Sequence, residues 1–292
     1  MAVLPENSKV QEWLDAAETI DQDSLDLGGA QYPWIQWVHG DKKLRAAGGV
    51  LYTGGWFCPA DNMPVENPEG WVAGSLSHDA GDDTEGWFAQ RITIVPIRSR
   101  RCWRVQDAGG ASQFFAWDKY DDAKALGNPK GKLQILALVK GLGDEPMVLT
   151  LSGTAGRAFQ PGGRGQTVMN QMRHCLIDPV NAMLRKHKGK AKFTWRAFWL
   201  TTGATDEPVF ETVGTGNATS VVTPPQAIGL KPKMSIDEIQ THYIGREMLE
   251  LVNGLYTDAE PWAQAWEQIA GEPETEKTAE PVEEVAEEEM PF

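Results

Sequence analysis

The sequence predicts a β-rich α+β fold with added helices and a disordered, acidic C-terminal tail. Three observations support this class: short apolar runs separated by turn residues, segments with helix-start signals, and a final stretch without apolar periodicity. The 292 residues are 41% apolar and 23% charged, with 30 Gly and 18 Pro. This composition is typical of a globular protein with many loops and excludes collagen-like, coiled-coil and wholly disordered chains.

Residues 1–29 form an acidic N-terminal segment, and residues 30–232 are expected to form a β-rich core. Runs of β-branched and aromatic residues bounded by Gly, Asp and Asn are typical of strands. The predicted strands are Tyr32–Val38, Val50–Phe57, Gly86–Pro96, Trp103–Gln106, Leu133–Lys140, Met147–Ser152, Lys192–Thr201 and Val209–Val213. Short strands with aromatic faces are compatible with an OB-like barrel or a related β-barrel core.

Two details of the strand pattern predict local geometry. Lys132–Lys140 and Met147–Ser152 are joined by a turn-rich connection of six residues, which predicts a β-hairpin. Pro96 lies inside a strand-like run, and because proline cannot donate a ladder hydrogen bond, it predicts a sheet edge or a bulge.

Helices are expected in an insertion near residues 166–188 and again at 233–270. The first is predicted from Gln166 to Cys175, and a second begins at Asp178, where Asp at N-cap precedes Pro at N1. Ser235 and Glu238 have the spacing of a capping box and predict a helix as far as Gly254. A last helix is predicted over Pro261–Ala270.

Charge is distributed unevenly along the chain. The formal net charge is −14, of which residues 271–292 contribute −8, whereas residues 86–204 carry +12. A local basic surface governs attraction to polyanions, so the middle segment favours a nucleic-acid partner. Residues 271–292 have no apolar period and are expected to be disordered.

The candidate binding residues are cations that alternate with aromatic rings. On a strand, Arg101 and Trp103 project to one face, and Cys102 and Arg104 to the other. Such a face suits single-stranded DNA, because cations neutralise phosphates and bases stack on rings. The alternative for each tryptophan is core packing, and for each arginine a solvated or ion-paired strand. The predicted DNA-binding residues are Arg98, Arg100, Arg101, Trp103, Arg104, Lys190, Lys192, Trp195 and Arg196, with weaker support for Trp56, Trp87, Arg157 and Arg164.

Catalytic and metal motifs are weak in this sequence. Cys58, Cys102 and Cys175 lack CxxC spacing, so no zinc site is expected. We expect no cofactor and no enzymatic activity. Two acidic clusters leave open a metal-dependent DNA-processing enzyme such as a nuclease; they are Asp82, Asp83 and Glu85, and Asp118, Asp121 and Asp122. A tryptophan-rich carbohydrate-binding or structural phage module is a further alternative, which the basic middle segment disfavours.

The last residues resemble the C-terminal tip of bacterial and phage single-stranded DNA-binding proteins, which ends in acidic residues, an apolar residue, Pro and Phe. The matching positions are Glu287, Glu288, Glu289, Met290, Pro291 and Phe292. The resemblance implies a tip that docks onto replication, recombination and repair proteins, while the body coats unpaired DNA. With no apolar span of membrane length and no secretory signal, we expect a cytoplasmic protein. A homo-oligomer is left open.

Overall fold

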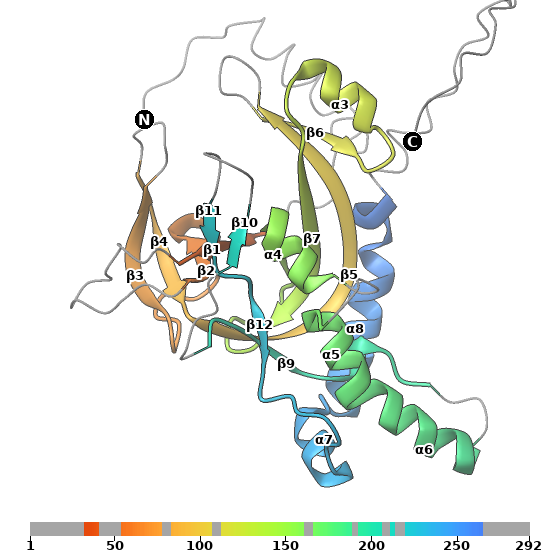
Figure 1. Cartoon of the computed structure of the whole chain (residues 1–292). Coiled ribbons are helices and arrows are strands. Elements are labelled where there is room, and N and C mark those ends of the chain that lie inside the picture. The colour runs from red at the N-terminus through yellow and green to blue at the C-terminus, as the bar shows by residue number, and fades with distance from the viewer. Residues whose placement is uncertain are drawn as a thin grey trace, which may run out of the picture.

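The structure, a computed structural model, describes residues 32–40, 54–77, 83–106, 112–160, 166–188, 192–205, 211–213 and 220–264 (Figure 1). The acidic N-terminal segment, the predicted tail and its tip at Glu287–Phe292 lie outside these ranges. So do the predicted site residues Arg164 and Lys190.

Ten strands form one mixed sheet, and a separate two-stranded sheet pairs β10 with β11. The strands are β1 (Trp34–His39), β2 (Gly54–Pro59), β3 (Val72–Ser77), β4 (Asp83–Ala89), β5 (Arg91–Gln106), β6 (Ser112–Ala116), β7 (Lys130–Val139), β8 (Met147–Ser152), β9 (Leu200–Gly203), β10 (Glu211–Val213), β11 (Ser220–Val222) and β12 (Gln226–Ile228). The large sheet runs β12-β9-β5-β7-β8-β1-β2-β4-β3, with β6 also paired to β5. The β-rich α+β class is confirmed; the described strands do not close, so the OB-like barrel is not confirmed.

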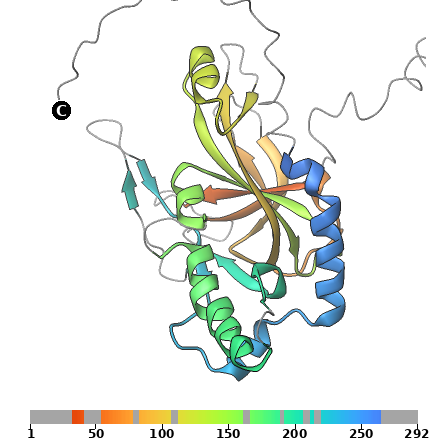
Figure 2. The same ribbon diagram turned by 90° about the vertical axis from the view of Figure 1, so that its right-hand side faces the viewer.

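Helices cover the sheet and extend from its end (Figures 1 and 2). They are the short helix η1 (Ala60–Asn62), α3 (Tyr120–Leu126), α4 (Gly153–Phe159), α5 (Val168–Met172), the π-helix η2 (Arg173–Ile177), α6 (Asp178–Lys188), η3 (Trp195–Ala197), α7 (Ile236–His242) and α8 (Arg246–Asp258). Neither α3 nor α4 was predicted from the sequence. Across the part of the chain that the structure describes, none of the helices has the length and apolarity needed to cross a membrane.

Strand β5 is the longest element of the sheet and has neighbours on both edges. One edge pairs with β7, and the other pairs with β9 at Arg91–Ile94 and with β6 at Cys102–Gln106. The register with β7 shifts between Pro96 and Arg98. The predicted bulge at Pro96 is therefore confirmed, as is the hairpin of β7 and β8.

Around the apolar part of β7, residues 135–139, the sheet is buried on both faces, which explains the nearly continuous apolar sequence there. Its inner face, bearing Ile94 and Ile135, belongs to the largest core cluster, which also includes Phe159 of α4. Its outer face, bearing Val95 and Leu138, packs against Val252 of α8. Alternate residues of β5 and β7 therefore face different helices.

The helical insertion is continuous from α5 through η2 to α6, whereas the sequence predicted a break before Asp178. Asp178 has helical dihedral angles and is not an N-cap. Pro179 lies in the helix interior, where it lacks an N–H, and the π-helical turn just before it changes the hydrogen-bond pattern at this point. The Asp178 side chain instead accepts hydrogen bonds from two side chains of the preceding turn.

The predicted helix from Ser235 to Gly254 is two helices. The capping box of Ser235 and Glu238 is present and starts α7, as predicted. The helix ends because Tyr243 pairs with Phe198 in an isolated bridge. Gly245, with φ of +85°, then allows the chain to turn into α8.

Two other strand predictions need correction. Gly86–Pro96 contains the end of β4 and the start of β5, separated at Gln90. Within Lys192–Thr201, residues 195–197 form η3, and only Leu200 and Thr201 belong to β9. In both places tertiary pairing overrides a continuous apolar pattern.

Candidate nucleic-acid interface

A three-stranded arm projects from one end of the sheet (Figures 1 and 2). We define the arm as residues 101–106 and 112–132, which comprise the end of β5, β6, α3 and the start of β7. Strand β5 is its central strand, with β6 on one edge and β7 on the other. Helix α3 connects β6 to β7, and its Ala123 is fully buried.

Two indole rings stack on the arm. The ring centroids of Trp103 and Trp117 lie 4.2 Å apart and the planes differ by 8°. The Trp103 Nε1 donates a hydrogen bond to the Trp117 carbonyl oxygen at 2.8 Å. Gly131 lies opposite Trp103 on β7, and a Cβ there would lie 3.4 Å from both indole rings. A methyl group at this position would therefore make van der Waals contact with both rings.

Exposed rings and cations surround this indole pair. Trp117 is 44% exposed, and Tyr120 is 42% exposed with its ring centroid 4.9 Å from that of Trp103. The Arg101 guanidinium lies 5.6 Å from the Trp117 ring centroid, and the Lys124 ammonium lies 5.9 Å from that of Tyr120. Arg101 and Trp103 thus share a face, as strand alternation predicted.

The arm carries a modest excess of positive charge. Six cations and three carboxylates give it a net charge of +3; they are Arg101, Arg104, Lys119, Lys124, Lys130 and Lys132, and Asp118, Asp121 and Asp122. Because most of these side chains are exposed, the arm combines a positive field with accessible ring faces.

A surface hollow of about 420 Å³ opens beside Trp117. It is lined by Ser99, Arg100 and Arg101 of β5, by Ala116 at the end of β6, by Trp117 and Asp118 of the following turn, and by Ala263. Strand β9 ends its pairing at Ile94 and β6 begins at Cys102, so the hollow lies at a gap in the edge of β5.

Arg98 and Arg100 project from the opposite face of β5, where Arg98 contacts the C-terminal end of α8 and Arg100 contacts Trp262 in the segment that follows it. The Arg98 Nε donates to the Tyr256 carbonyl at 2.6 Å, and its guanidinium stacks 3.8 Å from the Tyr256 ring centroid. Arg100 donates to the Trp262 carbonyl at 2.7 Å and to Gln134 Oε1 at 2.8 Å. Burial lowers the pKa of Arg100 to about 10. These arginines, predicted to bind DNA, have intramolecular partners.

Arg196 contributes to the same contact. Its guanidinium lies 3.7 Å from the Tyr256 ring centroid, so Tyr256 contacts both Arg98 and Arg196. Two guanidinium groups cannot overlap on one ring face, so they must take opposite faces. Arg196 therefore also stabilises the docking of α8.

The predicted tryptophans outside the arm are largely inside the protein. Trp56 is fully buried, donates to the Thr202 carbonyl at 3.1 Å and contacts Phe159 edge-on. It therefore presents no accessible ring face to a base. Trp195 is half-buried against the core, and Trp87 is half-buried on β4.

The remaining predicted cations are separated among several elements. Arg157 is exposed on α4 and donates to Thr154 Oγ1 at 3.3 Å. Lys192 is exposed before Phe193. Arg104 is half-buried on the end of β5 and pairs in register with Lys130.

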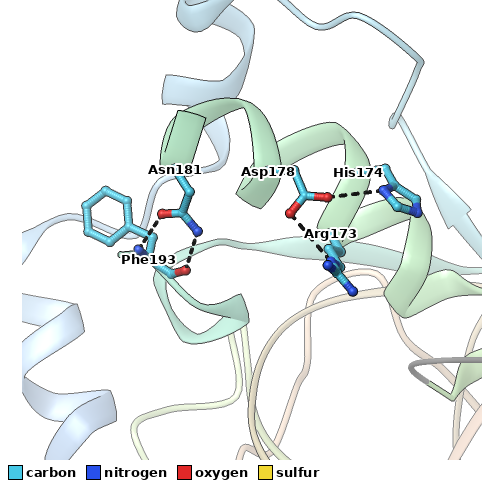
Figure 3. A network of polar contacts seen from close by, with 5 residues as sticks. All are labelled: Arg173, His174, Asp178, Asn181 and Phe193. Carbon is cyan, nitrogen blue, oxygen red and sulfur yellow. Dashed lines mark hydrogen bonds and ion pairs between the residues drawn. The ribbon is translucent and has the colours of Figure 1, made fainter. Parts of the chain in front are cut away.

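Asn181 of α6 fixes the segment that follows Lys192 (Figure 3). Its side-chain Nδ2 donates to the Phe193 carbonyl at 2.9 Å, and its Oδ1 accepts from the Phe193 N–H at 2.7 Å. Figure 3 also shows Asp178 accepting from Arg173 at 3.4 Å and contacting His174 at 3.2 Å. The Asn181 side chain therefore satisfies both backbone hydrogen-bonding groups of Phe193, as a paired strand would.

A half-buried lysine, Lys132, lies on the outer face of the arm. The Lys132 Nζ donates a hydrogen bond to Ser152 Oγ, directly across the β7–β8 ladder. Burial, together with Arg104 and Lys130, lowers the pKa of Lys132 to about 8. Burial raises the pKa of the neighbouring Cys102 to about 11.

The acidic clusters do not form a metal site within the described ranges, where no group of three His, Cys, Asp or Glu side chains could hold an ion. Asp82 lies outside those ranges, whereas Asp83 and Glu85 belong to β4. Asp118, Asp121 and Asp122 are exposed at the arm.

Sequence reasoning missed two of the three rings in the aromatic cluster. Trp117 and Tyr120 were not among the predicted site residues, nor was Lys124, because they follow β6 and do not alternate with arginines. The signal that could have found them is the aromatic run at 114–117, followed at once by Asp118 and Lys119.

No protein family, curated protein or solved structure matches this chain.

Proposed function

We propose that the protein binds single-stranded DNA through the arm. The observation that carries this proposal is the parallel, stacked pair of the half-buried Trp103 and the exposed Trp117 beside Arg101. An unpaired base stacks on a flat aromatic ring for about 1–3 kcal/mol, and it does so with little dependence on sequence. Arginine and lysine side chains next to the ring neutralise the phosphates on either side.

Duplex DNA is a poorer ligand for this surface. Its bases are already stacked and paired, so the faces of the rings on the arm would find no partner. The phosphates of a duplex still attract the cations, which gives weak binding that depends strongly on salt. Preference for single strands therefore follows from the rings, and overall attraction from the charges. The proposal does not depend on an OB-like barrel.

The acidic C-terminal segment has a separate proposed role. Residues 290–292 recruit replication, recombination and repair proteins in the cytoplasm, and residues 271–289 attract basic surfaces on those partners. This part of the proposal rests on the sequence pattern alone. Deleting residues 290–292 should leave DNA affinity unchanged and abolish co-purification of such proteins; loss of both activities would contradict the division of roles.

Tryptophan fluorescence and gel mobility test the DNA proposal directly. A single-stranded oligonucleotide should quench the fluorescence saturably at low salt, and the duplex of the same length should bind more weakly. The logarithm of the association constant should fall linearly with the logarithm of salt concentration. If the single strand neither quenches fluorescence nor shifts the protein in a gel, the protein does not bind DNA in this way.

A further inference from the structure

The edge of β5 has a gap in its strand pairing that could accommodate a ligand. Between Ile94 and Cys102, no described strand pairs with the edge of β5 that β9 and β6 share. The hollow of about 420 Å³ lies at the end of this gap that is nearer to Cys102. Pockets of about 300–1,000 Å³ are typical for small ligands, so the hollow has room for one nucleotide.

Its aromatic wall is held rigidly. Trp117 is 44% exposed, and its ring is supported by the parallel ring of Trp103 at 4.2 Å. The hydrogen bond from Trp103 Nε1 to the Trp117 carbonyl fixes the turn that carries the ring. A ring already fixed in place loses little conformational entropy when a ligand stacks on it.

The charged groups of the hollow have opposite signs. Arg101 and Asp118 both line it, and neither takes part in an ion pair within the described part of the chain. The guanidinium suits a phosphate, whereas a carboxylate repels one. Asp118 is therefore favourable in a polyanion site only if it accepts a hydrogen bond from a base. The exocyclic amino group of cytosine is such a donor, and thymine has a carbonyl oxygen at that position.

We propose that this hollow holds one unpaired nucleotide, with its base stacked on Trp117, its amino group bonded to Asp118 and its phosphate on Arg101. The inference rests on the proposed function and adds a preference at one position. It makes Asp118 a specificity-determining residue: oligo(dC) gains a hydrogen bond that oligo(dT) cannot make.

The experiment compares the affinities of the full-length protein for oligo(dC) and oligo(dT) of equal length. Asp118→Asn should lower the ratio of the dT to the dC dissociation constant by about threefold to tenfold, the range of one hydrogen bond. Asp121→Asn removes the same charge from α3, outside the hollow, and should leave the ratio unchanged. Photo-crosslinking of an oligonucleotide with one iodinated cytosine should label Trp117.

The possible outcomes separate this inference from the proposed function. A ratio that is the same in wild type and Asp118→Asn shows that the carboxylate acts through its charge alone, and the inference fails while DNA binding stands. Labelling that is confined to residues outside the hollow also overturns it. Failure of both oligonucleotides to bind the wild-type protein overturns the proposed function itself.

Discussion

The Trp103 indole N–H donates to the backbone carbonyl of Trp117 at 2.8 Å, while the two rings stack within 8° of parallel. Trp103 thus contacts Trp117 in two ways, by a hydrogen bond to its backbone carbonyl and by stacking on its ring. Trp103 is half-buried and Trp117 is exposed, so the inner ring supports the outer one. This relationship makes Trp117 the ring from which base stacking can be tested with least disturbance of the fold.

Trp117→Ala should weaken binding of single-stranded oligonucleotides by about tenfold, because one base loses its stacking partner. It should also reduce the quenching of the remaining tryptophan fluorescence. Trp34→Ala is the matched control, since Trp34 is 38% exposed on β1. Equal losses of affinity in the two variants, measured by fluorescence titration, would show that Trp117 has no special role.

Arg101→Ala should weaken DNA binding and lower the salt dependence. Each cation that contacts a phosphate contributes about one unit to the slope of log affinity against log salt. The slope should therefore become shallower by about one, with the free energy of unfolding changed by less than about 0.5 kcal/mol. Arg246→Ala controls for the loss of an exposed arginine, because Arg246 pairs with Glu250 on α8. An unchanged slope would remove Arg101 from the interface.

Arg100→Ala, unlike Arg101→Ala, should lower the stability of the fold. The variant loses the hydrogen bonds to the Trp262 carbonyl and to Gln134, and its stacking 4.1 Å from the Trp262 ring centroid. We expect the free energy of unfolding in urea to fall by about 2–4 kcal/mol. Arg100→Lys should recover only part of this, since an ammonium cannot make both bonds and stack. A variant as stable as wild type would mean that Arg100 does not hold the segment after α8 in place.

These two adjacent arginines show what the sequence could and could not predict. Strand alternation correctly placed Arg101 and Trp103 on one face. It could not predict that Arg98 and Arg100, on the other face, contact the end of α8 and the segment after it, because those partners lie about 160 positions later in the sequence. A run of cations on a strand is the same sequence signal whether the facing surface is solvent or a helix terminus.

Local signals predicted local structure well. The β7–β8 hairpin and the Ser235 capping box depend on residues close together in the sequence, and both were found. The helix start predicted at Asp178 is an exception, since the helix continues through this residue. Other errors occurred where distant segments pair. Tyr243 bridges to Phe198 and divides a predicted helix, and Trp56 packs on Phe159 and was mistaken for a binding residue.

Asn181→Ala should destabilise the protein without affecting the arm. The substitution leaves the N–H and C=O of Phe193, a half-buried residue, without their hydrogen bonds. We expect a loss of about 1–3 kcal/mol in the free energy of unfolding. Arg173→Ala, which removes only an exposed ion pair with Asp178, should change it by less than about 0.5 kcal/mol. Urea denaturation of both variants checks the difference, and similar small effects would contradict the role of Asn181.

Lys132 should make stability depend on pH. Its folded-state pKa of about 8 lies below the usual value of 10.5, because burial disfavours the charged amine. As pH rises through this window, the folded protein releases the proton before the unfolded chain does. Stability contributed by this group therefore increases from about pH 8 to about pH 10.5.

The comparison with Lys132→Met measures this effect together with the electrostatic coupling between Lys132 and the Cys102 thiol. The free energy of unfolding of the wild type minus that of the variant should rise between neutral and alkaline pH, measured by urea denaturation at several pH values. Lys130→Met controls for removing a cation from the same strand, since its side chain is exposed. If this difference in the free energy of unfolding stays constant or falls as pH rises, the folded protein holds the Lys132 amine in its charged form.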